Sequence, residues 1–268
     1  MTQFYPFDLA FGPQSIPLAP DSEGRPFFAS FPFMFGGAPV AGISCGLSSR
    51  FAGNMVYSEQ NPARLALFRA LGLDPQRVYG LKQIHSQDVL VVDRQNPPAV
   101  PAADGMVSCD QEIALSATVA DCLPVYLFDT ESGAFGLVHS GWKGTGIALR
   151  ALELMRERWH TKAEAVAAVL GPCIDSCCYR VDAERAAVFE KAFGAATRRL
   201  DDARGASWYL DLKAANVRLL EGAGVRNIAV CSGCTFTDER LGSFRREGGD
   251  YTRMAALVYR PQGTAPQF

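Results

Sequence analysis

The sequence predicts a single α+β domain in which mixed β-sheets are flanked by helices. Hydrophobic residues make up 48% and charged residues 20% of the 268 residues, which is enough apolar material for one full core. Short runs typical of strands alternate with segments whose apolar positions recur at helical spacing. Neither a fixed-period repeat nor a low-complexity linker divides the chain. Because the alternation is regular, a parallel sheet is the alternative architecture.

The N-terminal segment is expected to differ from the rest of the chain. Residues 1–35 follow neither the helical nor the strand period, so they predict an extended arm laid over the body. Residues 36–268 then form the single domain in which we expect the chemistry. The prolines that interrupt the arm are Pro6, Pro13, Pro17, Pro20, Pro26 and Pro32.

The first half of this domain is expected to hold one helix and the core strands. Pro62 opens a segment with helical spacing and Gly72 ends it, so a helix is expected over 62–71. Strands are expected on both sides of His85 and in the middle third, where Asp, Pro and Gly residues separate β-rich runs. These strands span 79–84, 89–93, 113–119, 125–129 and 134–138.

The second half repeats the mixture of helices and strands. Gly144 allows the chain to enter a helix over 145–159, in which apolar residues recur every three or four positions from Ile147 to Trp159. The remaining segments predict strands over 165–170, 208–210 and 227–231 and helices over 183–193 and 213–221.

Charge and cysteine usage exclude several classes of partner. The formal net charge is −2 without a long block of like charge, so nucleic acid is not expected. The N-terminus does not resemble a secretory signal, and no run reaches the ~18 apolar residues of a membrane span. Eight cysteines in such a chain are expected to be reduced thiols, which predicts a cytoplasmic protein. A monomer or a small homo-oligomer is expected.

Two of the three histidines and one cysteine stand at predicted strand ends. His139 follows an apolar strand and precedes Ser-Gly, Cys122 precedes a proline that stops regular pairing, and His85 lies between two strands. Two imidazoles and one thiolate are a known ligand set for catalytic zinc, which leaves a fourth position for water or substrate. The spacing is long and irregular, so the pattern alone leaves the metal as one of several interpretations.

Two other interpretations use the same residues. Each histidine could be a hydrogen-bonded structural residue. Cys122 and His139 could instead form the nucleophile pair of a Cys-His hydrolase, in which the imidazole lowers the thiol pKa. His85 discriminates between the two catalytic interpretations, because a dyad has no evident need for it whereas a metal site needs a third ligand.

Seven motifs over residues 42–259 resemble the laccase-domain family, formerly described as multicopper polyphenol oxidases. They are Leu81-Lys82-Gln83-Ile84-His85-Ser86, Ala103-Asp104-Gly105, Ala120-Asp121-Cys122-Leu123-Pro124-Val125, His139-Ser140-Gly141-Trp142-Lys143-Gly144-Thr145, Gly171-Pro172-Cys173-Ile174, Cys178-Tyr179 and Ser243-Phe244-Arg245-Arg246-Glu247-Gly248. Chance recurrence of all seven in this order is negligible.

The resemblance implies a zinc-dependent purine nucleoside phosphorylase with adenosine deaminase activity. Its implied partners are phosphate and the purine nucleosides adenosine, inosine, guanosine and methylthioadenosine. His85, Cys122 and His139 are the zinc ligands that it implies. The older description implies a copper-dependent phenol oxidase (laccase) instead, but a multicopper oxidase needs more than three imidazoles. A non-catalytic partner-binding protein is the alternative from a different class.

The resemblance also suggests residues that bind phosphate. Arg64 matches the arginine of the family's helix ahead of the first histidine, and Lys143 and Arg246 stand at motif positions. Their charges suit phosphate or a developing negative charge, although each could equally be structural. The segment from Arg50 to Met55 departs from the family pattern, which puts substrate contacts there in doubt.

Three further features have interpretations that are left open. Asp121 either caps the turn after its strand or orients a ligand. Cys173 either packs beneath the site or acts in it. Two cysteine pairs, Cys231 with Cys234 and Cys177 with Cys178, could form a four-thiolate zinc site if their segments were adjacent.

Overall fold

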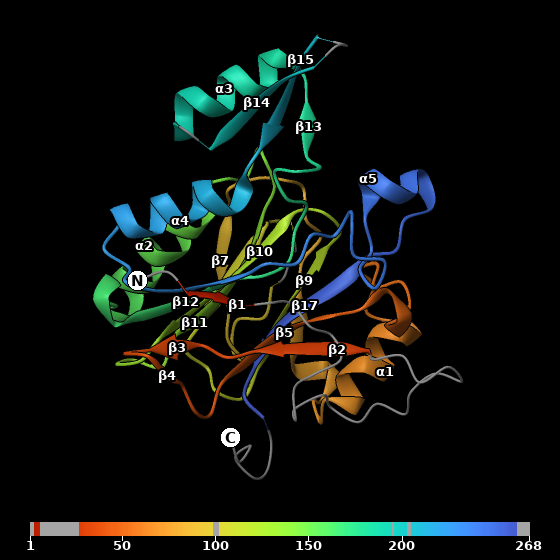
Figure 1. Ribbon diagram of the computed structural model, residues 1–268. Coiled ribbons are helices and arrows are strands. Elements are labelled where there is room, and N and C mark those ends of the chain that lie inside the picture. Colours follow the sequence, from red (N-terminus) through yellow and green to blue (C-terminus); the bar gives the residue numbers. More distant parts are fainter. Residues whose placement is uncertain (1–2, 6–26, 99–101, 195, 203–204, 262–268) are drawn as a thin grey trace.

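Two β-sheets packed face to face, each covered by helices on its outer side, form four layers in the computed structural model of the chain (Figure 1). The structure describes residues 3–5, 27–98, 102–194, 196–202 and 205–261. Both sheets contain parallel and antiparallel pairs, so the predicted α+β class with mixed sheets is confirmed.

The larger sheet has seven strands in the order β1-β16-β12-β10-β11-β8-β7. Its central strand β10 is antiparallel to both neighbours, whereas β12 pairs with β16 and β7 with β8 in parallel. The strands are β1 (Gln3–Tyr5), β7 (Val89–Val91), β8 (Gly105–Ser108), β10 (Leu123–Asp129), β11 (Phe135–Ser140), β12 (Val166–Leu170) and β16 (Asn227–Cys231).

The second sheet has five strands in the order β2-β5-β17-β9-β6. It combines segments from both ends of the described chain, since β17 lies between β5 and β9. The strands are β2 (Phe28–Phe31), β5 (Ser44–Ser48), β6 (Val78–Gly80), β9 (Ala114–Val119) and β17 (Met254–Tyr259).

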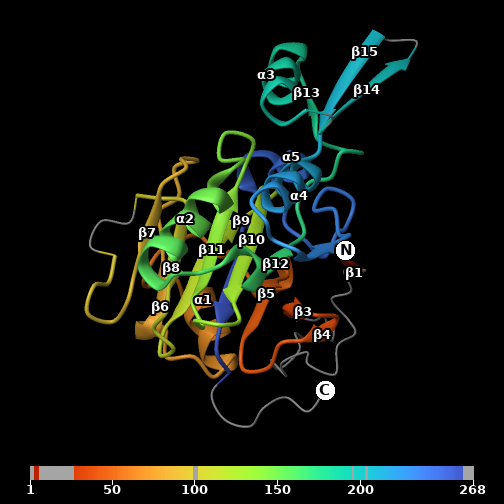
Figure 2. The same ribbon diagram turned by 90° about the vertical axis from the view of Figure 1, so that its left-hand side faces the viewer.

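The core lies in three apolar layers, because alternate residues of a strand face opposite sides of its sheet. In β10, Tyr126 and Phe128 face the second sheet, while Val125 and Leu127 face helices α2 (Ile147–Trp159) and α4 (Leu212–Gly222). The second sheet buries its outer face against α1 (Pro62–Ala70). Figure 2 shows α2 and α4 on the outside of the larger sheet.

A smaller unit projects from one end of these layers (Figures 1 and 2). It consists of α3 (Ala183–Phe193) and a three-stranded sheet in the order β13-β15-β14. The remaining elements are strands β3 (Met34–Phe35), β4 (Ala38–Pro39), β13 (Arg180–Val181), β14 (Thr197–Asp202) and β15 (Gly205–Leu210), helix α5 (Phe244–Glu247) and 3-10 helices η1 (Arg50–Ala52), η2 (Pro75–Arg77), η3 (Ala163–Ala165) and η4 (Gly248–Asp250).

The four predicted helices are confirmed, with ends that differ by no more than two residues. The strand predicted over 79–84 is too long: β6 ends at Gly80, because the chain then turns into the loop that carries His85. Of the expected arm, residues 1–2 and 6–26 lie outside the described residues, whereas residues 3–5 form β1 and residues 28–31 form β2. Among the described residues, each helix lacks the length and apolarity needed to cross a membrane.

Candidate metal centre

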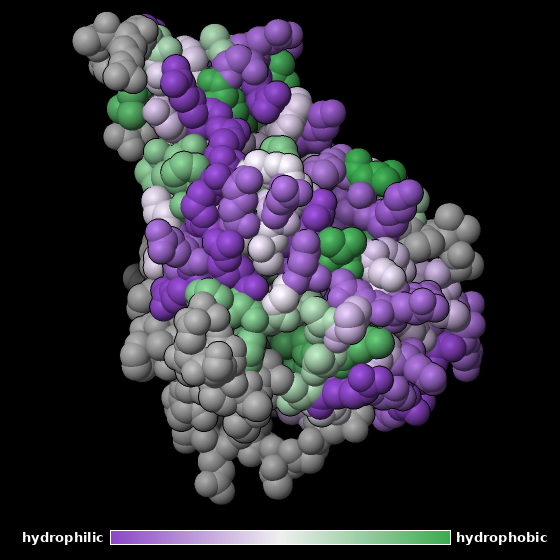
Figure 3. Space-filling view, turned by 90° about the vertical axis from the view of Figure 1, so that its right-hand side faces the viewer, coloured by the Kyte–Doolittle hydropathy of each residue, from purple (hydrophilic) through white to green (hydrophobic). Residues whose placement is uncertain are grey.

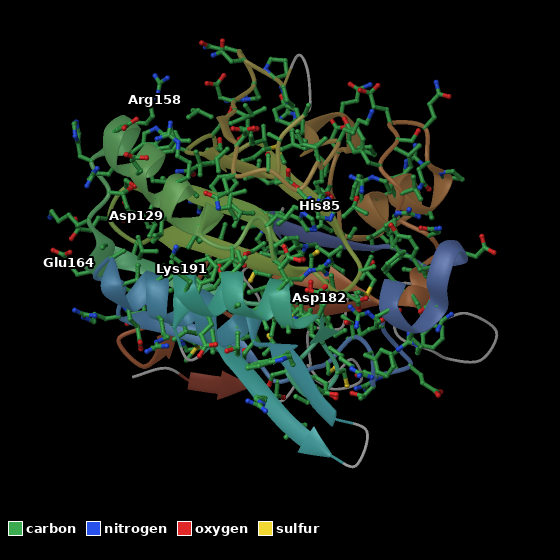
Figure 4. The ribbon with its side chains drawn as sticks, turned by 90° about the horizontal axis from the view of Figure 1, so that it is seen from above. His85, Asp129, Arg158, Glu164, Asp182 and Lys191 are labelled. Atoms are coloured by element: carbon green, nitrogen blue, oxygen red, sulfur yellow. The ribbon has the colours of Figure 1, made fainter. Side chains whose placement is uncertain are left out.

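Three chain segments bring His85, Cys122 and His139 together at one end of the larger sheet. Cys122 immediately precedes β10, and His139 lies in β11, where it pairs with Pro124. His85 lies in the loop between β6 and β7. One ligand atom from each of the three side chains lies within 4.8 Å of the other two. Figure 4 shows His85 at one end of the central strands and Asp129, the last residue of β10, at the other.

Asp104 joins two of these three segments through its carboxylate. Because β8 pairs with β11, Asp104 lies beside His139, and its Oδ1 is 2.8 Å from His139 Nδ1. The same carboxylate accepts hydrogen bonds from the N–H groups of Ile84, His85 and Ser86 at 3.1, 3.0 and 2.7 Å. A carboxylate on one imidazole nitrogen fixes the ring and leaves the other nitrogen, here Nε2, for a metal.

Two residues of the site have a left-handed backbone, which is uncommon for residues other than glycine. His85 has a φ of 60° and Asp121, next to Cys122, has a φ of 82°. The Asp121 carboxylate accepts hydrogen bonds from Thr235 Oγ1 at 2.6 Å, Ser243 Oγ at 2.7 Å and the Arg245 N–H at 2.7 Å. Asp121 therefore ties two distant segments to the start of β10 instead of capping only its own turn.

The electrostatics of the site favour a charged thiolate. Burial raises the pKa of Cys122, but the imidazoles of His139 and His85 outweigh burial and lower this pKa to about 6. Burial lowers the pKa of His139, whereas the Cys122 thiolate and Asp104 raise it to about 9. Burial also raises the pKa of Asp104, and its bonds to His139 and to the 84–86 loop lower it to about 2. Without a metal, thiolate and imidazolium stabilise each other.

Gly141 keeps the space beside the thiol open. A Cβ at this position would lie 2.9 Å from Cys122 Sγ and 3.5 Å from His85 Cδ2, so a side chain there would press on two of the three groups. Two imidazoles and a thiolate that converge in this way fit a zinc ion, whose bonds to nitrogen and sulfur measure ~2.0–2.3 Å. The residues present therefore fit a metal.

A cavity of about 330 Å³ opens in front of the three ligand groups. Its wall includes two aromatic rings, Tyr57 and Tyr251, and two cations, Lys82 and Arg253. The Arg253 guanidinium lies 3.9 Å from the centre of the Tyr251 ring. The volume is within the range of small-molecule sites, and its mixture of aromatic and cationic groups suits a flat, anionic or polar ligand.

The predicted phosphate residues lie in three different environments. Arg64 is 3% exposed; it donates to Met55 O and Ser116 Oγ, and burial lowers its pKa to about 10. Arg246 donates to backbone carbonyls of residues 235–241 and to Glu247. Lys143 is exposed in the loop after β11, with its Nζ 5.6 Å from the centre of the Trp142 ring.

Only three of the four cysteines considered for a four-thiolate zinc site lie together. Cys234, in the loop after β16, lies with Cys177 and Cys178, and their sulfurs are within 4.8 Å of one another. Cys231 is buried in β16 and is not part of that group. Cys173 is fully buried and pairs with Cys234 in an isolated parallel bridge.

Sequence reasoning missed the supporting role of Asp104 and the cavity wall. Asp104 stood in a recognised motif, and the signal was an acidic residue just before a buried strand. Tyr57, Tyr251 and Arg253 belong to segments distant from the histidines, so only the fold brings them to the cavity.

Comparisons with known proteins identify the family of the chain. The family model described as multi-copper polyphenol oxidoreductase laccase matches residues 45–261. A purine nucleoside phosphorylase of Corynebacterium glutamicum is 33% identical, over 90% of this chain and 98% of its own. Mouse purine nucleoside phosphorylase LACC1 is 29% identical over 90% of this chain, which spans only 56% of the mouse protein's length.

A solved structure has the same fold. The crystal structure of YlmD from Geobacillus stearothermophilus superposes with a TM-score of 0.73 at 28% identity, and the match covers 87% of this chain and 97% of that one. The chain therefore belongs to the multi-copper polyphenol oxidoreductase laccase family, the laccase-domain family that its motifs resemble.

Proposed function

We propose that this chain is a zinc-dependent purine nucleoside phosphorylase that also deaminates adenosine. The observation that carries the proposal is the convergence of His85, Cys122 and His139 on one point beside a cavity with aromatic and cationic walls. Relatives named purine nucleoside phosphorylase, 33% and 34% identical to this chain, support the same reaction class. The free thiols support a reducing compartment such as the cytoplasm.

His85, Cys122 and His139 would hold the zinc ion, with Asp104 fixing the His139 ring. When bound, the ion would supply Lewis-acid polarisation of an oxygen group brought beside it. Copper, which the family's description names, is the alternative ion. We favour zinc because the chain has three histidines and a multicopper oxidase requires more imidazoles.

The cavity wall offers groups for both substrates. Tyr57 and Tyr251 present rings on which a purine can stack, a contact worth about 1–3 kcal/mol for a nucleic-acid base. Arg253 and Lys82 line the same cavity and would bind phosphate through charge-assisted hydrogen bonds. The phosphate roles of Arg64, Lys143 and Arg246 stay predictions.

Phosphorolysis requires a phosphate oxygen to attack the ribose anomeric carbon while the bond from that carbon to the purine nitrogen breaks. The bonding electrons move to the purine nitrogen, which takes up the proton that the attacking phosphate gives up. Arg253 would hold the phosphate and spread its charge, and the tyrosine rings would keep the base in line with it. Deamination replaces the amino group at purine C6 by an oxygen from water and releases ammonia.

The test is to incubate the purified protein with adenosine and with inosine, each with and without phosphate. Base, ribose 1-phosphate and ammonia are then followed by chromatography. We expect phosphate-dependent release of base from both nucleosides and phosphate-independent ammonia from adenosine. His85→Ala should abolish both activities, whereas His160→Ala, at the C-terminal end of α2, should leave them intact. No product from folded, zinc-loaded protein would refute the proposal.

A Cys-His hydrolase is the second candidate, favoured by the lowered pKa of Cys122 beside His139. In that mechanism the thiolate is the nucleophile, so the activity needs no metal. A strong chelator separates the two: it should remove the phosphorolysis that we propose, and would leave acyl transfer by a dyad unchanged.

A further inference from the structure

A second group of thiols lies where two loops leave the larger sheet. Because β12 and β16 are parallel neighbours, the loops that follow them begin at the same edge. The Thr235 N–H donates to Cys173 O at 3.0 Å, which keeps the loops paired. Cys177 and Cys178 come from the first loop and Cys234 from the second, with their sulfurs within 4.8 Å of one another. We call these three residues the thiol group.

The most buried member of the thiol group already has the surroundings of a thiolate. Cys234 is 6% exposed, and the Asp175 N–H donates to its sulfur at 3.4 Å. The backbone N–H groups of Phe236 and Thr237 and the Thr237 side chain also act on this sulfur as hydrogen-bond donors. Convergent backbone N–H groups stabilise an anion in this way. A buried cysteine that only filled space would have no need of them.

A buried cation stands beside the same loops. Lys213 is 8% exposed; its Nζ donates to Asp175 Oδ1 at 2.7 Å and to Gly233 O at 3.0 Å. Asp175 and Gly233 are close neighbours of the thiol group in the sequence, one in each loop. Lys213 therefore links the two loops that carry the thiol group.

We propose that Cys177, Cys178 and Cys234 form a second metal site, for a soft, thiophilic ion, separate from the site of His85, Cys122 and His139. Thiolates select soft ions such as Cu(I) and Zn(II) over hard ones. On binding, each thiol gives its proton to solvent and its sulfur bonds to the ion, so no oxidant is required. Cys177 is exposed, which gives the ion a route of entry.

The test uses Cd²⁺ as the probe, with the whole protein kept reduced by a phosphine. Each cadmium–thiolate bond absorbs in the ultraviolet, so the amplitude of the absorbance change is proportional to the number of thiolates bound to Cd²⁺. We expect two ions and four thiolates in the unchanged protein, three from the thiol group and one from Cys122. The triple variant Cys177→Ser, Cys178→Ser, Cys234→Ser should bind one ion with about a quarter of the amplitude. Cys122→Ser should keep about three quarters.

Cys109→Ser is the matched control, because Cys109 is a half-buried free thiol outside both groups, and it should leave the amplitude unchanged. If the triple variant does not fold, Cys177→Ser alone should lower the amplitude by about a quarter. In the unchanged protein, Cd²⁺ should also slow alkylation of Cys177 by iodoacetamide. One bound ion with the amplitude of a single thiolate would overturn the proposal. An amplitude that neither the triple variant nor Cys177→Ser lowers, or a Cys177 that Cd²⁺ does not protect, would overturn it too.

Discussion

At the scale of single residues, the site depends on carboxylates as much as on its three ligand groups. Asp104 accepts hydrogen bonds from the loop of His85 and from the ring of His139, so one side chain sets the position of two ligands. The Asp121 carboxylate accepts hydrogen bonds from Thr235 and Arg245, and so holds the start of β10 beside Cys122. Losing such a buried acceptor leaves several donors without partners, and each unsatisfied donor lowers the stability of the fold by about 1–3 kcal/mol.

Asp104→Asn tests this role of the carboxylate. The amide keeps the shape but turns an NH₂ group toward a donor, so His139 loses its fixed orientation and the loop is held less well. We expect metal affinity to fall about 10–100-fold, as is usual when such a supporting carboxylate is lost. Competition with a chromophoric chelator measures the affinity. Asp88→Asn, an exposed neighbour, is the control, and equal affinities for the two variants would contradict the assignment.

The pKa values of Cys122 and His139 predict how metal affinity depends on pH. Between about pH 6 and 9 the thiol is already ionised, while His139 still carries the proton that a metal must displace. Affinity should therefore rise up to about tenfold per pH unit in this window and level off above a pH of about 9. Below a pH of about 6 the thiol is protonated too, so the slope should steepen. Affinity that does not change across the window would show that His139 is not a ligand.

At the scale of elements, the helices were predictable and several strands were not. Helices have a local signal: Pro62 at the start of α1 and the apolar period of α2 stand in the sequence itself. Strands β5, β8 and β17 were missed because their residues are held by partners far along the chain. His85, Cys122 and His139 could be selected as candidate ligands from predicted strand ends and the family resemblance. The supporting role of Asp104 could not be predicted, since it follows from the register of β8 against β11.

Gly46, in β5, lies opposite Ser30 of the edge strand β2. A Cβ there would lie 2.2 Å from Ala29 O and 2.6 Å from Phe28 Cε1, so Gly46→Ala must push the two strands apart. We expect the free energy of unfolding in urea to fall by about 1–3 kcal/mol. Gly222→Ala, in α4 with nothing within 4 Å of the added Cβ, should be neutral or slightly stabilising. Equal stabilities would mean that β2 packs less tightly than described.

At the scale of the whole molecule, the site exists only when the larger sheet is assembled. Its candidate ligands come from a loop, a strand end and a strand. The supporting residues Thr235 and Ser243 are more than a hundred positions along the chain from Asp121, whose carboxylate they contact. Figure 3 shows one face of the molecule, on which hydrophilic residues predominate and hydrophobic residues form a few patches. The sequence could supply the ligand types, but their convergence is a property of the fold.

The most direct measurement of the central claim is an anomalous difference map, recorded at the zinc absorption edge from crystals of the zinc-loaded protein. The account predicts a peak about 2.0–2.3 Å from Cys122 Sγ and from one nitrogen of each of His85 and His139. The peak should be absent in crystals of His85→Ala. A map without density between these three side chains, from protein that still cleaves nucleosides, would contradict the account.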